Sequence, residues 1–195
     1  MRKSSALILL IAACFVSTSI AQSESSGVRT PGWNRGLFGG YGNGVSDNSG
    51  FRRVTFGARF GRVLTSEHGL GILRGTLEWN AEVTPVEFFN YGQTVYTVGV
   101  TPLVAKWNFT SGERTVPFFE VVGGALFSSE KFPAGDTAKV NFQTGAGVGF
   151  HRFVRRGRAI DVEVRALHIS NASIGNHNPG VNAQLQFQLG YTWFK

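Results

Sequence analysis

Apolar and polar residues alternate along most of this chain. In residues 53–61 every even position is apolar and every odd position is polar or glycine. The same alternation recurs in three further segments, at 73–84, 140–150 and 184–193. A period of two residues is typical of β-strands that present one apolar and one polar face. These segments are therefore predicted to be strands that are buried, or covered by lipid, on one side only.

Four more segments fit a strand pattern less cleanly. They are the runs 95–109, 116–127 and 160–170, together with a glycine-rich run at 37–45. Turn-like sequences such as Asp-Asn-Ser-Gly and Thr-Ser-Gly-Glu separate the runs. Long strands joined hairpin to hairpin predict an all-β fold, an eight-stranded antiparallel up-and-down β-barrel over residues 36–195.

Two kinds of barrel have this pattern, and the polar face distinguishes them. A soluble barrel turns its apolar face inward, whereas an outer-membrane barrel turns it toward lipid and fills the interior with polar groups. The polar face here carries both signs of charge, which can pair inside a narrow barrel. Its charged residues are Arg53, Arg59, Arg74, Glu78, Glu82, Glu120, Asp161, Glu163 and Arg165.

Aromatic residues near the strand ends suit the girdles that flank the membrane in such barrels. They are Trp79, Phe88, Phe89, Tyr96, Trp107, Phe109, Tyr191 and Trp193. Together with the charged polar face they favour the outer-membrane β-barrel. A soluble barrel that carries a lipid inside remains the alternative.

The first 21 residues have the features of a signal peptide for export. Arg2 and Lys3 precede an apolar run at 6–16, and Ser19-Ile20-Ala21 supplies the small residues of a cleavage site. Residues 22–35 are predicted to be a flexible leader into the barrel. The rival interpretation is a lipoprotein, in which Cys14 would be the lipidated first residue.

Composition and charge exclude some classes of protein and restrict the chemical class of the binding partners. Only 16% of the residues are charged, which excludes a coiled coil, and the single Cys excludes a disulfide within the chain. The net charge of +7 favours partners that carry phosphate or carboxylate. The basic segment 152–158 could contact such groups, but a solvated hairpin turn is the simpler interpretation. Because an exported chain seldom meets nucleic acid, no nucleic-acid partner is predicted.

Neither a metal nor a cofactor is predicted. The four histidines are far apart or on different faces, and no Cys would survive signal cleavage. The Gly-Ala-Gly-Val-Gly run at 145–149 superficially matches a dinucleotide fingerprint, but it lies within an alternating strand. Its glycines are better explained as tightly packed strand positions.

One polar segment, residues 167–182, differs from the rest. His168 and Ser170 are two residues apart on a predicted strand, so their side chains emerge on the same face. That face is the apolar one, where polar groups are costly unless they function or lie at head-group level. A Ser activated by a His, with amide donors from the following loop, is the machinery of ester hydrolysis. The alternative is a polar strand end that enters a turn rich in Asn and Gly.

Several motifs give the chain a family resemblance. They are Ala-Lys-Trp-Asn-Phe at 105–109, Val-Pro-Phe-Phe-Glu at 116–120, the His168 segment through Asn182, and Gly-Tyr-Thr-Trp-Phe at 190–194. On these motifs the chain resembles the lipid A 3-O-deacylase (PagL) family, also described as acyloxyacyl hydrolase-related. The last hairpin is the most specific part.

The resemblance implies an outer-membrane enzyme that removes the ester-linked 3-O-acyl chain of lipid A without a metal. Ser170 would be the nucleophile and His168 the general base, with Asn171 and Asn178 at the oxyanion or substrate. The implied partner is lipid A or lipopolysaccharide in the membrane, and a homodimer is an open option.

The chain departs from the family pattern at one position. The family has a Glu about a dozen residues beyond the Ser, and Asn182 stands there in this sequence. An Asn can orient the His but does not stabilise an imidazolium by charge, a loss that can cost up to ~10⁴ in rate. Two hypotheses follow: an esterase that uses His168, Ser170 and Asn182, or a non-catalytic outer-membrane barrel with a degenerate active site.

Overall fold

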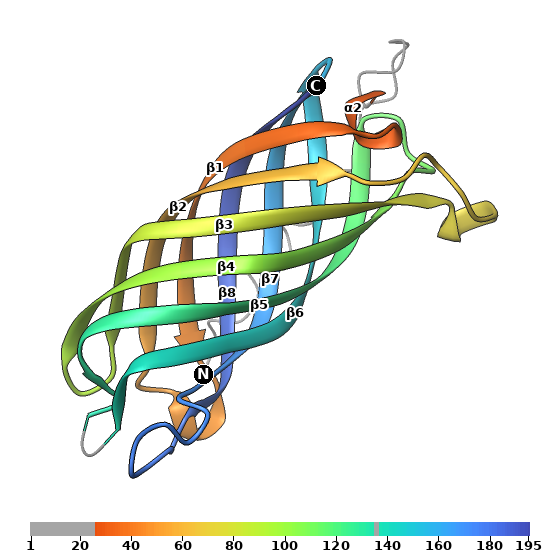
Figure 1. Cartoon of the computed structure of the whole chain (residues 1–195). Coiled ribbons are helices and arrows are strands. Elements are labelled where there is room, and N and C mark those ends of the chain that lie inside the picture. The colour runs from red at the N-terminus through yellow and green to blue at the C-terminus, as the bar shows by residue number, and fades with distance from the viewer. Residues whose placement is uncertain (1–25, 135–136) are drawn as a thin grey trace, which may run out of the picture.

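The chain folds into a closed antiparallel β-barrel of eight strands (Figure 1). The structure, a computed structural model, describes residues 26–134 and 137–195. Each strand pairs with the next one along the chain, and β1 pairs with β8 to close the barrel. The predicted outer-membrane β-barrel is confirmed. The elements are α2 (Ser26–Arg29), β1 (Gly32–Gly44), η2 (Ser46–Asn48), β2 (Arg52–Val63), η3 (Gly71–Leu73), β3 (Gly75–Asn90), β4 (Thr94–Phe109), β5 (Thr115–Phe132), β6 (Ala138–Arg155), β7 (Arg158–Ser170) and β8 (Val181–Phe194).

The barrel begins earlier than the sequence pattern indicated. Strand β1 starts at Gly32, so residues 32–35 of the predicted leader lie in the first strand. The predicted signal peptide, with Cys14, lies outside the described residues. None of the helices in the described part of the chain is long and apolar enough to span a membrane.

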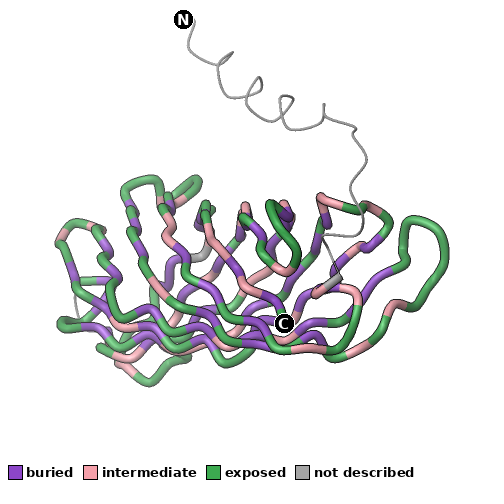
Figure 2. Tube along the Cα trace, turned by 90° about the horizontal axis from the view of Figure 1, so that it is seen from above, coloured by how far each residue is buried: buried purple, intermediate pink, exposed green. Residues whose placement is uncertain are grey.

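The two faces of the barrel differ as an outer-membrane barrel requires. Buried and exposed residues alternate along the strands (Figure 2). Large apolar side chains such as Leu37, Phe56, Phe187 and Leu189 are more than half exposed on the outside. Charged side chains are buried inside. This arrangement is the reverse of a soluble barrel, which hides its apolar face.

A network of ion pairs fills the middle of the barrel. Arg59 donates to Glu82 at 2.8 Å and to Glu163 at 2.6 Å. Arg165 donates to Glu82 at 2.7 Å and to Glu120 at 2.7 Å. All five side chains are at least 96% buried, so each charge depends on its partners for compensation.

Two glycines of β6 make room for this network. A Cβ atom at Gly147 would lie 2.9 Å from Glu120 Oε1 and 3.0 Å from Arg165 Cγ. At Gly149 it would lie 2.8 Å from Glu163 Cβ. The glycine run at 145–149 is therefore a packing feature of a strand.

Two residues lie elsewhere than the sequence analysis predicted. Arg74 is not inside the barrel: it precedes β3, is exposed and pairs with Glu67. Phe89 is not in an outer aromatic girdle but is fully buried inside. The register of β3 shifts between Thr84 and Glu87, and a β-bulge moves every later side chain to the opposite face.

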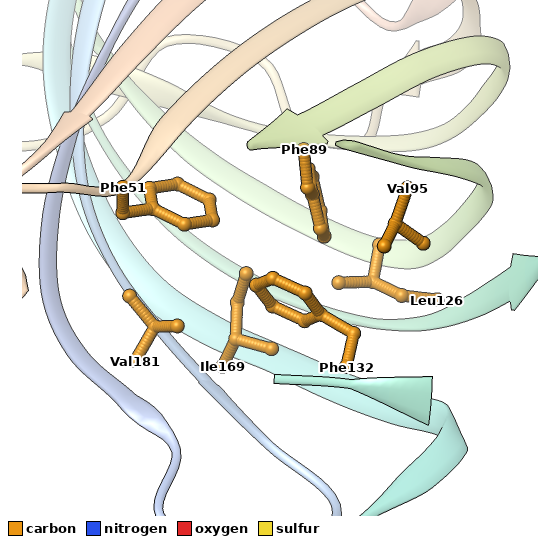
Figure 3. Close-up of a cluster of buried hydrophobic side chains, with 7 residues drawn as sticks. All are labelled: Phe51, Phe89, Val95, Leu126, Phe132, Ile169 and Val181. Carbon is orange, nitrogen blue, oxygen red and sulfur yellow. The ribbon is translucent and has the colours of Figure 1, made fainter. Parts of the chain in front are cut away.

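Apolar clusters close both ends of the interior. The end cluster shown in Figure 3 joins residues from β3, β4, β5, β7 and β8 with Phe51, which precedes β2. Its members are Phe51, Phe89, Val95, Leu126, Phe132, Ile169 and Val181. The cluster at the other end contains Val28, Val63, Val116, Phe153, Ala159 and Phe194.

Helix α2 is held against this second end of the barrel. Val28 is part of the second cluster, and its carbonyl accepts a hydrogen bond from Thr76 at 2.8 Å. Arg29 pairs with Glu67 of the β2–β3 loop at 2.5 Å. Partial burial raises the pKa of Glu67, but hydrogen bonds from Thr110 and Arg74 and the charge of Arg29 outweigh it and lower the pKa below its usual value.

Arg165→Met tests the interior network. The change leaves Glu82 and Glu120 without a principal partner, so we expect the free energy of unfolding to fall by about 3–5 kcal/mol. Urea unfolding of the barrel refolded in lipid measures it. The control is Arg155→Met, at an exposed position next to the β6–β7 turn, which should change stability by less than about 0.5 kcal/mol. Equal effects of the two substitutions would contradict the role given to the network.

Candidate active site

His168 and Ser170 lie side by side at the end of β7, on the outer surface. Both are partly exposed, whereas Leu167 and Ile169 between and beside them are buried inside. The register places His168 opposite Thr144 and Ser170 opposite Phe142 of β6. The two side chains are thus on one lipid-facing surface, as their parity predicted.

The Asn182 backbone lies next to this pair. Ile169 pairs with Val181 and Leu167 pairs with Gln184, so His168 faces a bulge that contains Asn182 and Ala183. The fold therefore brings Asn182 beside His168 from the neighbouring strand. The Asn182 side chain lies outside the described part of the structure.

Ser170 contacts the loop that follows it. Its Oγ accepts a hydrogen bond from the Ala172 main-chain N–H at 3.4 Å. Among the described residues, no hydrogen bond joins Ser170 to His168, although both stand on the same face. Catalytic hydrogen bonds are often long in the absence of substrate and shorten when it binds.

Asn171 organises the loop of residues 171–180. Its side chain is buried, donates to the His177 carbonyl at 2.9 Å and accepts from the Ser173 N–H at 2.9 Å. The Asn171 main-chain N–H donates to Asn178 Oδ1 at 3.1 Å. The two residues predicted to lie at the oxyanion are thus bonded to each other.

Two residues of this loop adopt the left-handed backbone region. Ala172 has a φ of 49° and Ser173 a φ of 62°. This conformation costs roughly 1–2 kcal/mol for a residue with a Cβ atom. Strained backbone of this kind clusters at functional sites, where the surroundings hold it in place.

The end cluster lies on the inner face of the two strands that carry the site, β7 and β8. Ile169 and Val181 point into that cluster, toward Phe51 and Phe132 (Figure 3). Because neighbouring residues on a strand point to opposite faces, burying Ile169 fixes His168 and Ser170 on the outside. Interior packing therefore sets the position of the surface pair.

Interior carboxylates cannot serve as the third member of the site. Asp161 lies 2.7 Å from His151 Nδ1, and Glu163 accepts from Arg59. Both carboxylates are 1% exposed and face the interior, on the other side of the sheet from His168.

A shallow groove of about 420 Å³ runs beside His168 on the outer surface. Its exposed lining includes Thr144, Ala166 and Leu185. A second groove of about 520 Å³, lined by residues such as Pro102, Gly123 and Phe142, crosses β4, β5 and β6 and also reaches Thr144. The sequence analysis missed Thr144 and Phe142, because only the β6–β7 register brings them to the site.

No group of three or more His, Cys, Asp or Glu side chains in the described part of the chain is arranged to hold a metal ion. The chemistry that the site offers from its own residues is that of a nucleophilic hydroxyl, an imidazole base and amide donors.

Comparisons with known proteins match this architecture. The family model for lipid A 3-O-deacylase (PagL) matches residues 56–192. The crystal structure of the outer membrane enzyme PagL aligns with a TM-score of 0.52 at 16% identity, covering 81% of this chain and 98% of that chain.

Two further barrels align less closely. Neisserial surface protein A gives a TM-score of 0.44 at 12% identity, covering 87% of this chain and 98% of its own. A de novo designed transmembrane β-barrel gives 0.41 at 13% identity, with coverage of 85% and 98%. No curated protein sequence matches the chain.

Asn171→Ala tests the order of the loop. Losing two side-chain hydrogen bonds should destabilise the local fold of residues 171–180 by about 1–3 kcal/mol, while the barrel stays folded. Hydrogen exchange of the Ser173 amide, followed by mass spectrometry or NMR, should speed up accordingly. Ser173→Ala is the control, because the exposed Ser173 side chain has no hydrogen-bond partner among the described residues. Unchanged exchange in Asn171→Ala would show that another contact orders the loop.

Proposed function

Because the chain belongs to the lipid A 3-O-deacylase (PagL) family, we propose that it is an outer-membrane serine esterase that removes the ester-linked 3-O-acyl chain of lipid A. The observation that carries the proposal is the pair of His168 and Ser170 on the lipid-facing surface. Polar groups on that surface are costly, and a site for a lipid substrate accounts for their place there.

The proposed orientation brings the substrate to the site. Residues 1–21 would direct export, and the chain would enter the membrane with its N-terminal end in the periplasm. Strand β7 then runs outward and ends at Ser170, level with the outer leaflet. Lipid A would reach Ser170 by lateral diffusion within the membrane, without entering the barrel.

The reaction would follow the usual course of a serine esterase. His168 takes the proton of the Ser170 hydroxyl while Oγ attacks the ester carbonyl carbon, and a tetrahedral intermediate forms. The bond between the former carbonyl carbon and the sugar oxygen then breaks. The proton on His168 is transferred to that oxygen, which leaves as the alcohol. Water, activated by His168, hydrolyses the acyl-enzyme and releases a free fatty acid.

Main-chain amides after Ser170 would stabilise the oxyanion. The Ala172 N–H already lies 3.4 Å from Ser170 Oγ. The Asn171 N–H is bonded to Asn178 Oδ1 at 3.1 Å, so it would exchange that oxygen for the substrate oxyanion. Asn178 would then contact the substrate through its side-chain amide.

Asn182 would take the place of the acidic member. Its backbone position opposite His168 suits a residue that orients the imidazole ring. An amide orients the ring without stabilising its positive charge, so we expect a slow enzyme. The two surface grooves that meet at Thr144 would hold acyl chains of the substrate.

The second candidate function is a non-catalytic barrel that has kept the outline of the site. It is favoured by Asn182, which stands where the family has a Glu. It is also favoured because, in the described part of the chain, Ser170 and His168 form no hydrogen bond with each other. Such a barrel would stabilise the outer membrane without turning over lipid.

Ser170→Ala decides between these functions. The detergent-folded protein should remove one hydroxyacyl chain from lipid A, and the variant should remove none because the nucleophile is gone. Mass spectrometry of lipid A before and after incubation measures the change. Ser173→Ala, three residues further along the same segment, should remain active. An unchanged lipid A spectrum with the folded natural chain would favour the non-catalytic barrel.

Asn182→Glu tests the third member of the site. A carboxylate beside His168 stabilises the imidazolium, so the deacylation rate should rise by at least about tenfold. Asn182→Gln lengthens the side chain by the same amount but adds no charge, so it should not raise the deacylation rate. If both variants behave like the natural chain, Asn182 does not act on His168.

A further inference from the structure

A groove at the opposite end of the barrel from Ser170 is unexplained by ester hydrolysis. It has a volume of about 500 Å³ and is formed by neighbouring parts of β2, β1, β8, the β6–β7 turn and the start of β7. The first and last strands of the barrel, β1 and β8, pair with each other there (Figure 1). Its walls are aromatic and its charged side chains are all basic. The lining includes Trp33, Arg35, Phe60, Arg156, Arg158 and Trp193.

The strand register arranges the key side chains in one row. Arg35 pairs with Phe60 on one side and with Trp193 on the other, and Trp193 pairs in turn with Arg158. All four side chains project from the outer face. Two arginines therefore flank one tryptophan, with their backbones roughly 10 Å apart, two strand spacings. Guanidinium groups on long side chains can converge on a single anion across that gap.

No acidic side chain compensates the positive charge of this row. No Asp or Glu lines the groove. Within the described part of the chain, neither Arg35, Arg156 nor Arg158 forms an ion pair or a side-chain hydrogen bond. Asp161 and Glu163 of the adjoining strand β7 point inward and pair with Arg59 of the interior network. Unpaired like charges that share one groove repel one another until an anion binds.

The local backbone fixes the groove in place. Gly157 has a φ of 64°, and a Cβ atom there would lie 2.6 Å from the Phe194 carbonyl oxygen. Phe194 donates its main-chain N–H to the Gly157 carbonyl at 2.8 Å. On the other wall Trp33 stacks on Phe60 with ring centroids 5.1 Å apart. The cationic turn is thus tied to β8, and the apolar wall is rigid.

We propose that this groove binds the phosphate head group of an anionic glycerophospholipid, with Arg35 and Arg158 on the phosphate and the Trp193 and Trp33–Phe60 rings against the glycerol and first methylenes. Arginine favours phosphate because its planar fork donates two hydrogen bonds at once. Tryptophan favours the interface between head groups and acyl chains. In the proposed orientation the groove lies at the periplasmic leaflet; the binding itself is independent of the esterase.

Native mass spectrometry tests this site. The protein refolded in an uncharged detergent is titrated with phosphatidylglycerol or with phosphatidylcholine of the same acyl chains. Phosphatidylglycerol should bind more tightly, and Arg35→Gln with Arg158→Gln should weaken it at least about tenfold. The control double variant, Arg52→Gln with Lys139→Gln, removes the same charge at the other end of the barrel and should bind like the natural chain.

Three outcomes would overturn the proposal. They are equal affinity for the two lipids, unchanged phosphatidylglycerol binding in the groove variant, and an equal loss in the control variant, which would mean that net charge alone attracts the lipid. Arg35→Lys with Arg158→Lys keeps the charge and should retain part of the preference. If the glutamine pair does not refold, Arg158→Gln alone carries the test, with Arg52→Gln at the other end of the barrel as its control.

Discussion

Closure of the hydrogen-bond ladder between β1 and β8 is the constraint on which the rest of this molecule depends. Within a bilayer no water is present to satisfy an open strand edge, so every main-chain donor and acceptor must pair inside the sheet. Closure also separates two environments. Lipid covers the outer face, and the inner face becomes a narrow space in which charges survive only as partners of one another.

The functional features follow from this separation. The carboxylates in the middle of the strands face inward, where Arg59, Arg165 and Lys106 compensate them. The outer face keeps apolar residues, a few arginines at one end and the His168–Ser170 pair at the other. A hydrolytic site on this outer face therefore finds no acidic residue on its own strand. Its third member has to come from β8, where this chain has Asn182.

Much of the fold could be predicted from the sequence because strand periodicity is a strong signal in a barrel with two contrasting faces. The alternation at 53–61 and 184–193 identified which side chains face lipid. Phe89 was predicted for an outer girdle from its place near a strand end, and it lies inside because the register of β3 shifts between Thr84 and Glu87. The alternation also misplaced Arg74, because this residue lies between the short helix η3 and the start of β3 and so is not part of a strand. Parity also placed His168 and Ser170 together on the outside, whereas the contacts of Asn171 and the proximity of Thr144 depend on loop and register geometry.

The two apolar clusters at the ends of the barrel carry a consequence for the membrane itself. Phe51, Phe89 and Phe132 close one end, and Val28, Phe153 and Phe194 close the other. Between them the charged groups are held in ion pairs with one another. Such a filled interior is the opposite of the water-filled lumen of a porin, so we expect a bilayer that contains this barrel to keep its electrical resistance.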